Sequence, residues 1–228
     1  MSLAPQTGLQ PLRIVLGEPP SLRGRLLQLR DRVARCVERL NAVLRIEAGS
    51  SAPFAQIISY VFARRDQRGV IYDRTVSEAG MLANVLSHVG FKAGTGLDAE
   101  RDFDDGQLEI LIRVTGQLCR GPRHAVGYVL HVSSPTSIET YVADLIGATN
   151  GKTMVASTVH CPPCNADPKS EFEVYCRSRV CRYAQIVRRT EPSLIEPPPH
   201  VFSCDHCDVC FSEPHGIHEE ECGELITV

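Results

Sequence analysis

Residues 108–114 (LEILIRV) and 126–132 (VGYVLHV) are the stretch of sequence from which the fold is predicted. In both segments apolar side chains recur at every second position, which is the period of a strand with one buried face. Residues 119–123 (CRGPR) lie between them and carry the Gly-Pro pair of a turn. We therefore predict an antiparallel hairpin over residues 108–132.

The segments before this hairpin favour helices. After Ser21, a suitable N-cap, apolar residues alternate in steps of four and three, which predicts a helix over residues 21–47. Its apolar stripe is wide enough to need a partner, either the chain's own sheet or a second copy in a homo-oligomer. Pro53 opens a second helix, and Thr75 and Glu78 form a capping box at the start of a third.

The remaining segments complete an α+β prediction. We expect an acidic loop at residues 92–106 and a further helix at residues 136–146. Further strands are predicted at residues 69–73, 152–159, 172–175 and 183–188. The fold class is α+β: helices on a small, mainly antiparallel sheet, followed by a zinc-stabilised C-terminal module.

Composition divides the chain into an irregular N-terminal segment (1–20), an α+β domain (21–154) and a cysteine- and histidine-rich zinc-binding module (155–228). Within the module, residues 155–190 carry 6 Lys/Arg and 3 Asp/Glu, net +3, and residues 191–228 carry 9 Asp/Glu and no Lys or Arg, net −9. No stretch approaches the roughly 20 apolar residues of a membrane span. The N-terminus lacks the features of a signal peptide. We therefore expect an intracellular protein, in the cytoplasm or nucleus.

Eight of the ten cysteines lie between residues 161 and 222. In an intracellular chain, clustered cysteines favour metal over disulfides. The first group pairs a CxxC loop with a second cysteine loop eleven residues later, which is typical of a zinc ribbon or a treble-clef-like unit. Its candidate ligands are Cys161, Cys164, Cys176 and Cys181.

The second group has more candidate ligands than one tetrahedral site needs. They are Cys204, Cys207, Cys210, His215, His218 and Cys222. The four cysteines can serve together, or Cys204 and Cys207 can serve with two of His215, His218 and Cys222. The CxxCxxC spacing is also compatible with an iron–sulfur cluster. In a further alternative, one metal site takes ligands from both cysteine groups. We predict about two zinc ions per chain.

Motifs for catalysis are weak. Residues 147–153 (GATNGKT) are one residue short of a phosphate-binding loop, and they follow a predicted helix where that loop requires a strand. Both metal groups offer four or more ligands, whereas a catalytic zinc keeps an open position. We therefore lean towards a protein that is not an enzyme.

The sequence thus predicts a non-catalytic zinc-binding adaptor or regulatory protein, with a zinc-finger-like module, that binds other proteins in a larger assembly, such as one that acts in gene expression. The first alternative is a zinc-dependent nucleic-acid-binding protein. Its phosphate contacts would come from Arg177, Arg179, Arg182, Arg188 and Arg189. The second alternative is a metal-dependent hydrolase or a ubiquitin-ligase-like enzyme. We favour a protein partner because the nine carboxylates of residues 191–228 oppose the approach of phosphates.

Overall fold

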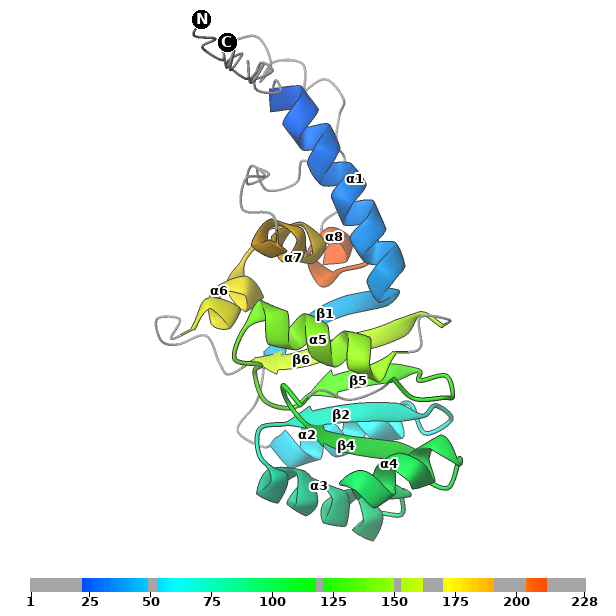
Figure 1. The fold of residues 1–228 in the computed structure, drawn as a ribbon. Helices are drawn as coiled ribbons and strands as arrows, with labels where there is room; N and C mark the ends of the chain where they lie inside the picture. The colour runs from blue at the N-terminus through cyan, green and yellow to red at the C-terminus, as the bar shows by residue number, and fades with distance from the viewer. Residues whose placement is uncertain are drawn as a thin grey trace, which may run out of the picture.

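The structure, a computed structural model, describes residues 22–48, 53–117, 121–149, 153–161, 170–190 and 204–212. Its centre is a six-stranded sheet with the strand order β1-β6-β5-β2-β4-β3 (Figure 1). All its pairings are parallel. The strands are β1 (Ala42–Ala48), β2 (Gly69–Asp73), β3 (Ala93–Thr95), β4 (Ile110–Val114), β5 (Tyr128–His131) and β6 (Val155–Cys161).

The predicted antiparallel sheet is therefore wrong. β4 and β5 do not form a hairpin, because β2 lies between them and pairs with both in parallel. Ile71 of β2 is in register with Ile112 of β4 on one side and with Leu130 of β5 on the other. The class is α/β, with helices on both faces of a parallel sheet, as parallel strands require.

The buried charge of Arg113 explains why the strands were predicted to be antiparallel. Arg113 on β4 suggested a solvent-facing position, but its side chain is only 3% exposed. Its guanidinium donates to both carboxylate oxygens of Glu100, each at 2.8 Å, and to the carbonyl of Gly147 at 2.7 Å. Burial opposes the charged form of Arg113, but Glu100 and Tyr72 together outweigh it, and the pKa of Arg113 is raised.

The helices form two layers (Figure 1). α2 (Pro53–Phe62) and α3 (Val76–His88) cover one face of the sheet, with Ile57 and Leu82 in their core. The other face carries α4 (Leu97–Asp104) and α5 (Ile138–Ala148), and four helices gather around the β1 edge of the sheet: α1 (Leu22–Leu40), α6 (Glu171–Arg177), α7 (Arg182–Thr190) and α8 (Asp208–Ser212). None of the helices in the described ranges is long and apolar enough to cross a bilayer.

The predicted helix 21–47 ends earlier than expected. α1 stops at Leu40, Asn41 takes a left-handed φ of 47°, and the chain continues as β1. Of the apolar stripe, Leu29, Val33 and Leu40 are buried within this chain, where α1 packs against α7. A second copy is therefore not needed to cover these residues.

Other elements are confirmed or corrected in the same way. The strand at residues 69–73 and the helix that starts at Pro53 are confirmed. The Thr75 hydroxyl accepts from the Glu78 amide at 3.2 Å, which confirms Thr75 as the N-cap of α3, and it donates to the Glu78 carboxylate at 2.8 Å. The acidic loop at residues 92–106 is wrong, because β3 and α4 occupy it. The strands predicted at residues 172–175 and 183–188 are also wrong, since these residues lie in α6 and α7.

Candidate metal centre and basic groove

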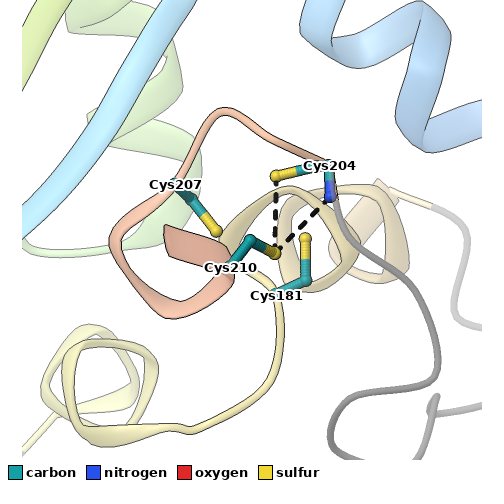
Figure 2. A group of neighbouring side chains, drawn as sticks. All are labelled: Cys181, Cys204, Cys207 and Cys210. Carbon is teal, nitrogen blue, oxygen red and sulfur yellow. Dashed lines mark hydrogen bonds between the residues drawn. The ribbon is translucent and has the colours of Figure 1, made fainter. Parts of the chain in front are cut away.

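Four cysteines converge beside α7. Cys181 immediately precedes α7, and Cys204, Cys207 and Cys210 come from the loop that leads into α8 and from α8 itself. Figure 2 shows the four side chains gathered around one point, and all four sulfurs lie within 4.8 Å of one another. The Sγ atoms of Cys204 and Cys210 are 3.8 Å apart. A zinc tetrahedron with bonds of about 2.3 Å has edges of about 3.8 Å, so the cluster has the dimensions of a zinc site.

The chemistry of this cluster also fits a divalent cation. Hydrogen bonds to Cys181 and the other thiols lower the pKa of Cys210, while those from the same neighbours raise the pKa of Cys204. The four groups therefore do not ionise together by themselves, because each thiolate disfavours the next. A bound zinc ion stabilises all four thiolates. These cysteines can hold one zinc ion in a closed site made only of sulfur.

The ligands come from both predicted groups, an arrangement that the sequence left open. Cys181 belongs to the first cysteine group and joins three members of the second. Cys176 is buried on α6 and is not part of the four-sulfur cluster. Cys161 ends β6, but its side chain lies outside the described residues. The other predicted ligands lie entirely outside the described residues: Cys164, His215, His218 and Cys222.

The metal loop also covers the edge of the sheet. The amide of Leu44 on β1 donates to the carbonyl of His206 at 2.8 Å, and the amide of Ile46 donates to the carboxylate of Asp208 at 3.1 Å. Leu44 and Cys207 thereby form a parallel bridge. An open edge strand invites pairing with other chains. The metal loop occupies this edge, so a bound zinc ion would stabilise the sheet as well as the module.

Arg182 fixes the metal loop to the rest of the protein. Its Nε and Nη2 atoms donate to the two carboxylate oxygens of Asp208 at 2.9 and 3.2 Å. The guanidinium also donates to the carbonyls of Tyr175, Cys176 and Ser178. Burial opposes its charge, but Asp208, Tyr175 and Cys176 together outweigh that penalty, and the pKa of Arg182 is raised. Arg182 is 4% exposed, so it does not reach an external phosphate.

The other arginines predicted to contact nucleic acid lie in different environments. Arg189 is paired with Glu139 on α5 and with Glu171 on α6, the latter at 2.7 Å. Arg177 and Arg188 are partly buried, and Arg179 is exposed. These arginines therefore do not form a single open basic patch.

A different set of arginines borders a groove of about 430 Å³ between α1, α5 and α7. We call it the basic groove. Arg32, Arg35 and Arg39 line it from one side of α1, and Arg189 lines it from α7. Among the described residues, neither Arg35 nor Arg39 forms an ion pair. The floor of the groove is apolar and includes Leu40, Val142, Ile146, Ile186 and Val187. Sequence reasoning missed the groove because its three helices are far apart in the chain.

Sequence reasoning also missed a buried polar group beneath α5. His131 Nε2 lies 3.2 Å from the carboxylate of Asp144, and neither side chain is more than 1% exposed. The imidazole stacks on the ring of Tyr72, with ring centroids 4.8 Å apart. Burial lowers the pKa of His131, although Asp144 opposes this shift. The group is sealed from solvent and packs the core.

No protein-family model and no curated protein matches this sequence. Solved structures that are similar to the chain include the following three. The first is the Escherichia coli DEAD-box protein SrmB bound to regulator of ribonuclease activity A, with 14% identity and a TM-score of 0.42 over 52% of this chain and 75% of that one. The second is a DEAD-box protein from Methanococcus jannaschii, with 17% identity and a TM-score of 0.47 over 68% of this chain and 41% of that one. The third is the RNA helicase Prp28 from Chaetomium thermophilum bound to ADP, with 16% identity and a TM-score of 0.45 over 53% of this chain and 33% of that one. The chain spans less than half of the last two.

The parallel sheet corrects the prediction of a non-catalytic zinc-binding adaptor or regulatory protein, because it replaces the small, mainly antiparallel domain on which that prediction was built.

Proposed function

We propose that this chain is a nucleic-acid-binding α/β domain that contacts phosphates through the basic groove. The observation that supports it is the row of Arg32, Arg35 and Arg39 along one side of α1. Residues at i, i+3 and i+7 share one side of a helix and rise by about 4.5 and 6 Å between neighbours. A row of guanidinium groups at this spacing suits a chain of phosphates, because each can bind phosphate oxygens in a bidentate manner.

The groove predicts binding that is independent of base sequence. No aromatic side chain is among the described residues that line it, so it offers no platform on which bases could stack. Phosphate contacts position a nucleic acid but do not read its sequence. We therefore expect single-stranded RNA and DNA of any sequence to bind with similar, salt-sensitive affinity.

The expected salt dependence of binding follows from the number of arginines in the row. On single strands each phosphate contact contributes a slope of about −0.7 to log K against log salt, so three contacts give about −2. Raising the salt fourfold, from about 50 to about 200 mM, then weakens binding about 20-fold. Fluorescence anisotropy with labelled mixed-sequence RNA and DNA measures this slope.

A paired substitution tests the assignment to the basic groove. In the double variant Arg35→Ala and Arg39→Ala one contact remains, so the same change in salt should weaken binding only about threefold. The matched control is Arg65→Ala with Arg74→Ala, which removes the same charge from exposed positions outside the groove. Equal losses in both double variants, or no measurable binding by the unaltered chain at about 50 mM salt, would refute the proposal.

The predicted count of about two zinc ions belongs to this proposal. The four-sulfur cluster supports one of them. A second ion would draw on Cys161, Cys164 and Cys176, of which Cys176 is a buried thiol on α6. We expect native mass spectrometry of the intact chain to find the mass of two zinc ions; a single ion would limit zinc to the four-sulfur cluster.

A further inference from the structure

Phosphate binding uses the arginines of the basic groove and leaves its apolar floor without a role. The floor joins α5 to α7 through Val142, Ile146, Ile186 and Val187. A ligand that matches the whole groove carries acidic and aliphatic side chains together. We propose that this ligand is the C-terminal segment of the same chain, residues 213–228, which docks in the basic groove and competes there with nucleic acid.

The charge of this segment complements the groove. Residues 213–228 (EPHGIHEEECGELITV) hold five Glu and no Lys or Arg, a net charge of −5. The other terminal segment outside the described residues, 1–21, holds one Arg and one Glu and is neutral. Of the two terminal segments, the C-terminal one therefore opposes the charge of Arg32, Arg35 and Arg39. Three consecutive carboxylates, Glu219 to Glu221, match a row of three guanidinium groups in number.

The aliphatic residues of this segment complement the floor. Leu225, Ile226 and Val228 follow the acidic run within four residues of Glu224. Apolar surface that leaves water contributes about 25 cal/mol per Å², so an exposed aliphatic floor favours such side chains. Phosphates gain nothing from this part of the groove, because charged groups lose their hydration against apolar walls.

The C-terminal segment is also long enough to reach the basic groove from the end of α8. The described chain ends at Ser212 on α8, and α8 packs against β1, the strand that follows α1 directly. The nine residues from 213 to 221, which end with the acidic run, can span up to about 30 Å. A helix is about 10–12 Å across, and the three arginines cover only about 10 Å along it. The acidic run therefore reaches the groove even if it passes around α1.

Docking is tested by cross-linking, which does not depend on nucleic acid. Ala143 is exposed on α5 and lines the basic groove, so Ala143→Cys introduces a thiol there without removing an arginine. A short bismaleimide should join this thiol to Cys222, which follows Glu221 directly. The matched control is Ala55→Cys on α2, an exposed position on the opposite face of the sheet. Peptide mapping of the zinc-loaded full chain identifies the product.

We expect the Cys222 product at position 143 in at least fivefold excess over position 55. Replacing the three carboxylates (Glu219→Gln, Glu220→Gln and Glu221→Gln) should remove this excess and, by freeing the arginines, should tighten nucleic-acid binding. Equal yields at the two positions, or an excess that survives the three substitutions, would overturn the inference. The competition with nucleic acid rests on the proposed function, whereas the cross-link does not. A cross-link without nucleic-acid binding would thus refute the proposed function and leave the docking intact.

Discussion

Replacing Arg182 with Ala should cost more stability than replacing any exposed arginine of the same region. The substitution removes a buried guanidinium that binds both oxygens of Asp208 and three backbone carbonyls. The side chain of Asp208 is 22% exposed, so it is left as a mostly buried and uncompensated charge. Breaking a buried ion pair by removing one partner costs about 3–5 kcal/mol. Water can reach part of Asp208, so we expect about 3 kcal/mol, the lower end of that range.

The measurement is urea unfolding followed by circular dichroism. With an m value of about 2–3 kcal/mol/M, a loss of about 3 kcal/mol lowers the midpoint by about 1–1.5 M. The matched control is Arg179→Ala, an exposed arginine three residues away, for which we expect a change within about 0.5 kcal/mol. Since Arg182 fixes Asp208 beside the metal loop, its loss should also speed the removal of zinc by a chelator. Equal midpoints and equal rates of zinc loss for the two variants would refute this account of Arg182.

Three further predictions concern the core and the metal loop. Gly69→Ala should destabilise the protein by at least about 2 kcal/mol, because a Cβ there would lie 2.0 Å from the ring of Tyr128. The control is Gly80→Ala on α3, where an added Cβ would have no neighbouring atom within 4 Å, and it should be neutral or stabilising in the same urea assay. Cys207→Ser should release zinc and speed hydrogen exchange at the β1 amides that the metal loop covers; exchange as slow as in the unaltered chain would contradict this. Burial lowers the pKa of His131, so as the pH falls His131 is protonated in the unfolded chain before it is protonated in the folded chain. Stability should therefore fall as the pH drops below about 6.5, and the urea midpoint of His131→Gln should fall less over the same range.

The sequence by itself determined the features that depend on neighbouring residues. The N-cap of Thr75 and its contact with Glu78 close within four residues, so the spacing was sufficient to predict that these two residues meet at the start of α3. The CxxCxxC spacing of Cys204, Cys207 and Cys210 likewise brings three sulfurs together within one loop. The start of α2 at Pro53 follows from the fixed φ of proline.

Features that depend on distant residues were decided by the tertiary structure. Cys181 and the second cysteine group are separated by more than twenty residues, so only folding selects Cys181 as the fourth ligand. The residues of α6 and α7 suit a strand or a helix by local pattern, and packing against α1 and α5 favours the helices. The basic groove joins three helices and has no signature in any one of them.

The direction of the strands is the clearest case. Ile110, Leu111 and Ile112 are all buried, which is typical of a parallel strand covered on both faces, but Arg113 and Glu109 on either side suggested a solvent-facing edge. The partner that neutralises Arg113 is Glu100 on α4, a residue that no local pattern connects to β4. Whether a charged side chain is buried can be judged only when the position of the residue that neutralises it is known. The sequence thus determined the strands β2, β4 and β5, and the tertiary structure decided how they pair.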